Sequence, residues 1–205
     1  MIATIQYNSR KLQIDLSKPL DISMPIISSK KNVNAWYIDE PKIEPIKDAE
    51  WIASVSKGAS VNFNNIYFNP HAHGTHTECA GHITEKVYSI NQNLKTFFFL
   101  AEVITVAPEN DNEDKIISKK QLQFAIGNKK RDAIILRTIP NTREKLSRQY
   151  SHTNWPYLKE DAVKFMVSKG VKHLLIDLPS IDKEKDGGEL LGHNAFWNTK
   201  GKLRL

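Results

Sequence analysis

Cysteine is nearly absent from this chain of 205 residues, since Cys79 is the only one. A single cysteine excludes an internal disulfide framework and is typical of a reducing compartment. Long hydrophobic runs are also missing: the longest, Thr96 to Ala107, is interrupted by Glu102 and falls short of the roughly 20 residues of a transmembrane helix. The opening segment, Met1 to Tyr7, lacks the features of a secretory signal. We therefore expect a cytoplasmic protein with no membrane partner.

Neither sign of charge dominates the sequence. Lysine and arginine number 29 against 23 acidic residues, which leaves a net charge of +6, and most basic residues have acidic neighbours. The basic clusters coincide with no recognition helix, zinc-finger spacing or aromatic RNA-binding signature. We expect no nucleic-acid partner, because scattered charge supports only weak, salt-sensitive binding.

Helix and strand signals alternate in the second half of the chain. Ser118 to Gly127 is typical of a capped helix that ends at glycine, and Leu158 to Lys169 of an amphipathic helix. The apolar segments Asp132 to Thr138 and Val171 to Asp177 are typical of strands. This alternation predicts the α/β (α+β) class with a mixed sheet, in one domain spanning residues 1–205.

The first half predicts extended structure and a long surface segment. Leu12 to Leu16 has the period-two pattern of a strand, and Phe97 to Val106 is a candidate buried strand. Val33 to Lys57 has weak periodicity, which favours a surface excursion or lid. Val61 to Phe68 is predicted to form a hairpin by itself, because two β-type runs flank an Asn-Asn pair.

Four of the seven histidines lie within twelve residues: His71, His73, His76 and His82. In an extended segment His76 and Glu78 project to the same face, so one imidazole and one carboxylate can reach the same ion. His71 or His73 would complete a three-ligand set with an open position, as in a catalytic zinc or manganese site. His82, farther along with the same parity, would then handle protons. The alternative is an exposed polar loop, and the in-phase glutamate favours the metal site.

Other polar and aromatic residues give weaker signals. Trp36, in the predicted lid, and Trp155, before the second predicted helix, are candidate substrate contacts, or they pin their loops to the core. Asp177 and Asp182 flank a strand end where sites often form, although turn chemistry explains them equally well.

The histidine segment carries a family resemblance. Gly74-Thr75-His76-x-Glu78-x-x-x-His82 resembles the H-x-G-T-H-x-D-x-P-x-H signature of the cyclase / kynurenine formamidase family of metal-dependent hydrolases. Further segments are similar to that family in the same order along the chain: Ile14 to Leu20 through Met24-Pro25, Asp132 to Thr138, Leu158 to Lys169, and Ile176 to Asp182 followed by His193. The resemblance covers almost the whole chain.

The resemblance implies a swivelling β/β/α fold, a homodimer, and hydrolysis of a small-molecule amide or cyclic amide through metal-activated water. Carried over by position, His76 is a metal ligand and Glu78 stands where the family has a ligating aspartate. His82 is the catalytic acid/base, and His193 is a ligand at a second metal position. Zinc is the expected metal, with manganese as the alternative.

The chain departs from the family pattern at three places. The family's first histidine falls at Ala72, with His71 and His73 on either side, and a one-residue bulge would let His71 serve. Glu78 is one methylene longer than aspartate. The family's glutamate ligand follows the position of His193, whereas here no acidic residue follows Glu189. A metal-binding or structural family member without catalytic activity is therefore the second interpretation.

Overall fold

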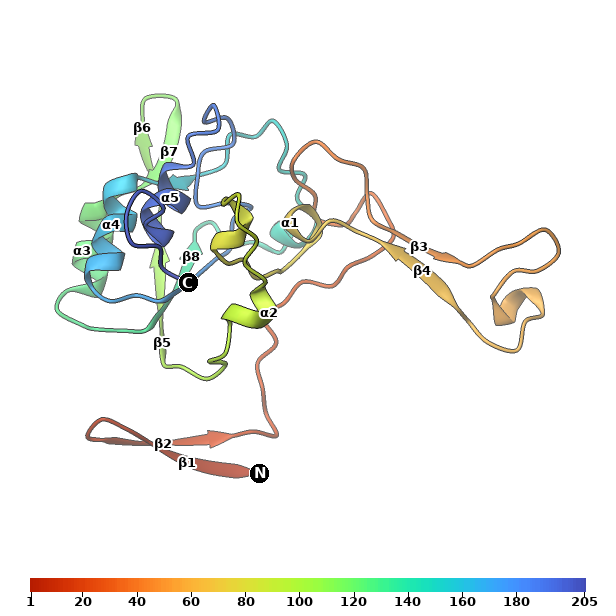
Figure 1. Cartoon of the computed structure of the whole chain (residues 1–205), viewed down its shortest axis with the longest axis horizontal. Coiled ribbons are helices and arrows are strands. Elements are labelled where there is room, and N and C mark those ends of the chain that lie inside the picture. Colours follow the sequence, from red (N-terminus) through yellow and green to blue (C-terminus); the bar gives the residue numbers. More distant parts are fainter.

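A parallel three-stranded sheet lies within the main body of the computed structural model, which describes residues 1–205 (Figure 1). Its strands are β5 (Ala101–Val106), β8 (Ala133–Thr138) and β10 (His173–Ile176), in the order β10-β8-β5 (Figure 1). The connections between them carry α3 (Lys119–Ile126) and α4 (Glu160–Ser168). The mixed α/β class expected from the sequence is confirmed.

Local signals account for the two helices. Ser118 accepts a hydrogen bond from the backbone N–H of Gln121, whose side chain in turn accepts from the Ser118 N–H, and α3 ends at Gly127 with a positive φ of 55°. Glu160 and Asp161 lie in the first turn of α4, where acidic side chains complement the helix dipole. Both predicted helices are confirmed.

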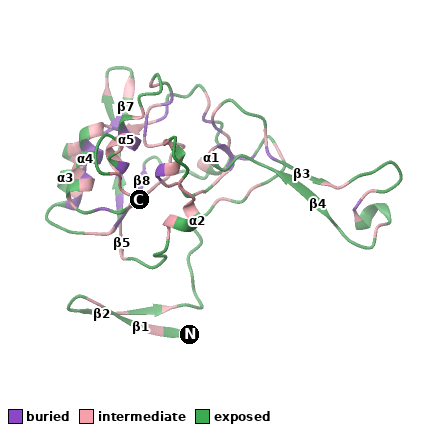
Figure 2. Cartoon of the chain, viewed as in Figure 1, coloured by how far each residue is buried: buried purple, intermediate pink, exposed green.

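The main hydrophobic core lies between this sheet and the helices (Figure 2). Its largest fully buried side chains come from strands, helices and the connection after α4: Ile117, Leu122, Ile126, Ile134, Leu136, Leu158, Val163, Met166 and Val171. Burial of this apolar surface, at about 25 cal/mol per Å², is the main stabilising contribution to this part of the fold.

A second three-stranded sheet, in the order β6-β7-β9, contributes Ile117 and Leu158 to this core. Its strands are β6 (Glu109–Asp111), β7 (Asp114–Ile117) and β9 (Tyr157–Leu158), with one antiparallel and one parallel pairing. Three 3-10 turns occur elsewhere, at Val55–Lys57, Ala80–His82 and Arg143–Leu146.

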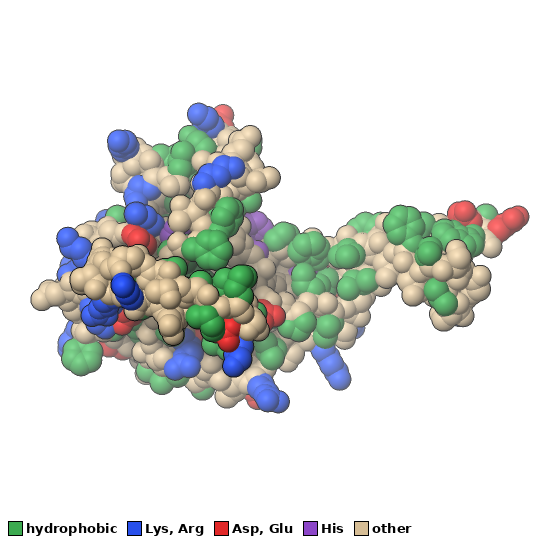
Figure 3. Space-filling model, turned by 90° about the horizontal axis from the view of Figure 1, so that it is seen from below, with side chains coloured by type: hydrophobic (Ala, Val, Ile, Leu, Met, Phe, Trp, Pro, Cys, Tyr) green, Lys and Arg blue, Asp and Glu red, His purple; other side chains and the backbone are tan.

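Two antiparallel ribbons project from the body (Figure 1). The first joins β1 (Ile2–Tyr7) to β2 (Arg10–Asp15), and β2 overlaps the strand predicted for Leu12 to Leu16. The second joins β3 (Lys42–Pro45) to β4 (Asn64–Tyr67). We call residues 42–68 the arm. Figure 3 shows hydrophobic side chains along the length of the arm.

Two strand predictions need correction. The hairpin expected within Val61 to Phe68 is wrong, because Asn65 lies inside β4 and pairs with Glu44. The Asn-Asn turn signal is local, whereas strand pairing depends on a partner about twenty residues earlier. The buried strand expected from Phe97 begins only at Ala101, and Phe98 is 90% exposed.

Three short helices complete the chain: α1 (Pro70–His73), α2 (Ile90–Asn93) and α5 (Leu191–Trp197). The sequence predicts none of them, because segments of four to seven residues carry too few periodic positions. None of the helices has the length and apolar character needed to span a bilayer.

Candidate metal centre

Three short elements carry the histidine segment. Asn69 caps α1 by accepting the backbone N–H of His71 at 2.9 Å, and proline occupies the first helical position. The chain then runs without helix or strand from Gly74 to Cys79 and closes in the 3-10 turn Ala80–His82. Gly81 is required in this turn, since a Cβ atom there would lie 2.3 Å from the carbonyl oxygen of Tyr88.

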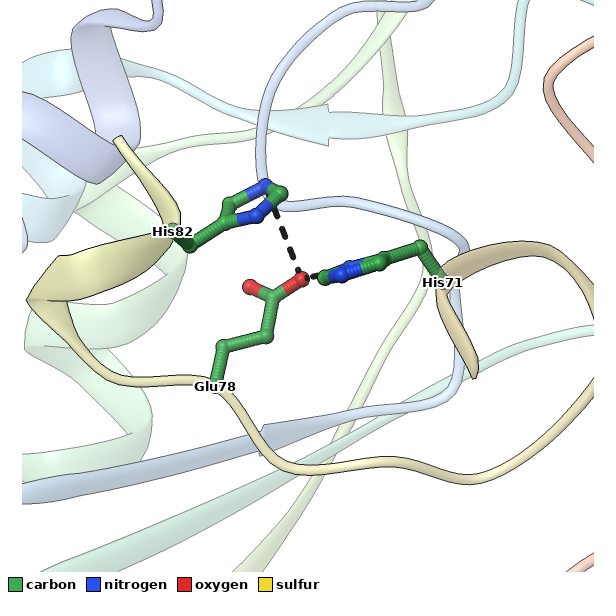
Figure 4. Close-up of side chains that lie close together, drawn as sticks. All are labelled: His71, Glu78 and His82. Atoms are coloured by element: carbon green, nitrogen blue, oxygen red, sulfur yellow. Dashed lines mark hydrogen bonds and ion pairs between the residues drawn. The ribbon is translucent and has the colours of Figure 1, made fainter. Parts of the chain in front are cut away.

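The side chains of His71, Glu78 and His82 converge (Figure 4). Glu78 Oε1 lies 2.6 Å from His71 Nδ1, 3.1 Å from His76 Nε2 and 3.6 Å from His82 Nε2. One ligand atom from each of His71, Glu78 and His82 falls within 4.8 Å of the other two. The imidazole rings of His71 and His82 stack with their centroids 4.5 Å apart.

His193 joins this cluster from α5. Its Nε2 atom lies 3.5 Å from Glu78 Oε2, and the residue is 7% exposed. Four imidazoles, those of His71, His76, His82 and His193, therefore surround one carboxylate, and we call these five residues the Glu78 cluster.

The cluster shifts the acid–base properties of its members. Burial alone would raise the pKa of Glu78, but hydrogen bonds from His193 and His76 and the charge of His82 hold that pKa well below its usual range. Burial alone would lower the pKa of His193, but its contacts with Asp182 and Glu78 raise it to about 9. For His82, burial outweighs the attraction of Glu78 and lowers the pKa.

His73 does not join the cluster. It is 3% exposed, its Nδ1 atom accepts the backbone N–H of Asn69 at 2.9 Å, and its Nε2 atom lies 2.8 Å from the carbonyl oxygen of Asp39. Both ring nitrogens are thus bound to backbone groups, and His73 anchors α1. Of the two alternative first ligands that the sequence left open, the structure brings His71 to Glu78.

The two candidate substrate tryptophans pack against each other. Trp36 and Trp155 meet edge to face with ring centroids 4.9 Å apart, in a small cluster with Val33, Ala35 and Tyr150. Trp155 is 2% exposed and donates its indole N–H to the carbonyl oxygen of Asp182 at 3.2 Å. Trp155 therefore presents no free face to a substrate in this structure, whereas Trp36 is only partly buried.

Comparison with protein families gives a match over most of the chain. The family model described as "Putative cyclase" matches residues 14–183, which include the histidine segment. The chain belongs to the cyclase family. A search of curated proteins found no match.

Solved structures similar to this chain share its fold. One is described as a "Potential Metal-Dependent Hydrolase With Cyclase Activity"; it is 14% identical with a TM-score of 0.56, and the match covers 87% of this chain and 76% of the other. A second, a "predicted metal-dependent hydrolase from Bacillus stearothermophilus", is 15% identical with a TM-score of 0.53 and coverage of 86% and 77%.

The donor atoms of the Glu78 cluster suit a divalent transition metal. Imidazole nitrogens and a carboxylate oxygen are the ligands found in catalytic zinc sites, which use three protein ligands and leave a position open. Cys79 points elsewhere, because its thiol donates to the carbonyl oxygen of Tyr88 at 3.0 Å. The residues present therefore fit a metal ion held by histidine and Glu78.

Asp182 lies beside the cluster, and the sequence alone does not assign it a role. The Asp182 carboxylate accepts hydrogen bonds from the backbone N–H groups of Gly192 and His193 and contacts His193 Nδ1. The only feature of the sequence that indicates a functional role for Asp182 is its position after a predicted strand. An aspartate in that position is equally well explained by a turn. The contact became visible only when α5 was positioned.

Proposed function

We propose that this protein is a divalent-metal-dependent hydrolase that cleaves an amide or cyclic amide bond in a small molecule of the cytoplasm. The convergence of three imidazoles on one oxygen of Glu78 carries the proposal, because it brings metal ligands and a proton-transfer group together. The similar solved structures, described as potential or predicted metal-dependent hydrolases, support the same reaction class. Zinc suits this nitrogen-rich donor set best, and manganese is the alternative metal.

Each residue of the Glu78 cluster has a distinct role in this proposal. His71, His76 and Glu78 would hold the metal, and His193, which faces the other oxygen of Glu78, would be a ligand at a second metal position. A bound divalent ion lowers the pKa of a coordinated water towards about 7 and polarises the scissile carbonyl. His82 would accept a proton and return it to the leaving nitrogen, because its lowered pKa favours a neutral ring at pH 7 and its side chain is 34% exposed.

Metal binding tests the ligand assignment directly. His76→Ala and Glu78→Ala are expected to abolish stoichiometric zinc or manganese binding, measured by elemental analysis and titration calorimetry. His173→Ala is the matched control, because His173 lies on β10 and stacks on Phe99 rather than on the cluster. Stoichiometric metal in both cluster variants would refute the assignment.

Turnover tests the reaction class. A panel of formamides, lactams and isatin-like cyclic amides, assayed with added zinc or manganese, is expected to contain a substrate. His82→Ala should keep the metal but lose about 10²–10⁴-fold in rate, the usual contribution of a general acid/base. Equal rates in the variant and the native protein would remove His82 from the mechanism.

A metal-binding protein without hydrolase activity is the second candidate function. Two other acidic side chains of the segment before His193 are engaged elsewhere: Glu184 binds Tyr37, and Asp186 accepts the backbone N–H groups of Gly188 and Leu190. Glu78 is thus the one carboxylate within the cluster. Metal binding without turnover of any panel member would favour this candidate.

We also propose the swivelling β/β/α arrangement for the complete fold and a homodimer as the assembly. The chain exposes 14069 Å², whereas a compact monomer of its mass exposes about 9,700 Å². The excess, about 4,300 Å², is well above the roughly 800 Å² that each partner buries in a standard interface. The arm supplies exposed apolar side chains, Phe63, Ile66, Tyr67 and Phe68, that a second copy would cover.

A further inference from the structure

Asp182 lies at the start of α5 and acts as its cap. The residue before the helix, Leu190, has a positive φ of 46° and forms no side-chain cap. Asp182 supplies the missing acceptor from eight residues upstream, since its carboxylate binds the N–H groups of Gly192 and His193. Gly192 permits this approach, because a Cβ atom there would lie 2.7 Å from Asp182 Oδ1.

Hydrogen bonds hold both the backbone and the side chain of Asp182 in place. Its backbone N–H donates to Ser180 Oγ at 3.1 Å, and its carbonyl oxygen accepts the indole N–H of Trp155 at 3.2 Å. The residue is only 4% exposed. A buried, fully bonded carboxylate holds its partners in one geometry, because any movement would leave charged oxygens without donors.

His193 is the partner that links Asp182 to the cluster. His193 Nδ1 is in hydrogen-bond contact with Asp182 Oδ2, while Nε2, on the other side of the ring, lies 3.5 Å from Glu78 Oε2. An ionised carboxylate can only accept, so Nδ1 carries the hydrogen of this bond. A histidine whose Nδ1–H is bound in this way keeps the Nε2 lone pair for a metal.

We propose that Asp182 is a positioning residue that fixes the ring orientation and tautomer of His193, so that Nε2 faces the metal position of the Glu78 cluster. Trp155 supports this role by anchoring the Asp182 backbone. The inference rests on the proposed function, because it assigns a purpose to His193 only if the cluster binds a metal.

The test is the zinc affinity of Asp182→Asn. An asparagine oxygen can still accept a helix N–H, but the amide group donates towards Nδ1 and favours the tautomer with the hydrogen on Nε2. Zinc affinity is expected to fall about 10–100-fold, as for other outer partners of ligating histidines. Asp177→Asn is the matched control, because that carboxylate follows the same strand and binds Thr138 and Lys145. Its zinc affinity should equal that of the native protein.

Two further measurements separate positioning from a merely structural role. In the His193→Gln background, Asp182→Asn should cause no additional loss of zinc affinity, because the residue acts through His193. In the zinc-loaded native protein, nitrogen NMR should show His193 coordinated through Nε2 with a proton on Nδ1. This measurement stands even where Asp182→Asn fails to fold.

The outcomes distinguish this inference from the proposed function. A native protein that binds neither zinc nor manganese refutes the proposed function and, with it, the role of Asp182. A native protein that binds zinc, with Asp182→Asn within twofold of its affinity, overturns only the role of Asp182. Coordination of the zinc by His193 through Nδ1 would also overturn the role of Asp182.

Discussion

Glu78 organises the candidate centre at the scale of single residues. Its two oxygens face four imidazoles, with Oε1 serving His71, His76 and His82 and Oε2 serving His193. In the metal-free protein this carboxylate raises the pKa of His76 and of His193 and so favours their protonated forms. The same oxygens are the ones that a metal ion would use, so metal binding and protonation of the histidines compete.

The raised pKa of His193 predicts that the stability of the metal-free protein depends on pH. Burial lowers the pKa of His193, but Asp182 and Glu78, the acidic groups that face it, raise the pKa to about 9 from an ordinary 6.5. Because the folded-state pKa is the higher one, this contribution is fully present below pH 6.5 and is lost as pH rises to about 9. It amounts to about 3 kcal/mol.

Urea unfolding at pH 6 and pH 9.5, in the presence of a chelator, measures this effect. The native protein should be less stable at the higher pH, and His193→Gln should remove most of the difference. A variant with the same pH dependence as the native protein would contradict the assignment to His193.

At the scale of elements, signals contained within one helix were reliable. The serine cap, the terminal glycine and the amphipathic pattern of α3 and α4 act over ten residues or fewer, and both helices form where they were predicted. The pairing of β3 with β4 was missed, because strand pattern alone does not name a partner.

The capping box of α3 gives a prediction at this scale. Ser118→Ala removes the acceptor for the backbone N–H of Gln121 and should lower the free energy of unfolding by about 1 kcal/mol. Ser89→Ala is the control, because Ser89 occupies the cap position of α2 without a side-chain cap hydrogen bond. Chemical denaturation of both variants makes the comparison, and equal losses would contradict the capping role.

At the scale of the whole molecule, the two ribbons and the exposed segment Phe97 to Phe99 lie outside the main core. The β1–β2 ribbon and the arm extend away from the body, and both are largely exposed (Figure 2). An apolar surface of this extent is typical of a protein–protein interface. A second copy of the chain is the partner that we propose.

The homodimer predicts how arm variants behave in solution. The double variant Phe63→Ser, Tyr67→Ser removes two apolar side chains that are 57% and 58% exposed, and should shift the protein from dimer to monomer in light scattering after gel filtration. Phe124→Ser is the control, since Phe124 is 93% exposed on α3, away from the arm. A native protein that is monomeric at micromolar concentration would contradict the proposal.

The sequence by itself determined the α/β class, the two longest helices, the central strands β8 and β10, and the group of histidines around Glu78. Each of these depends on residues close together in the chain, where capping, periodicity and ligand spacing act directly. The family resemblance added His193, which no local spacing connects to the cluster.

Only the tertiary structure decided which side chains meet. In the folded chain both ring nitrogens of His73 contact backbone groups, and His71 is the histidine of this pair that contacts Glu78. The tertiary structure also placed Asp182 against His193 and Trp155 behind Asp182. These contacts join segments that are distant in sequence, and they form only because packing of the core fixes where α1, α5 and the loop after β10 lie.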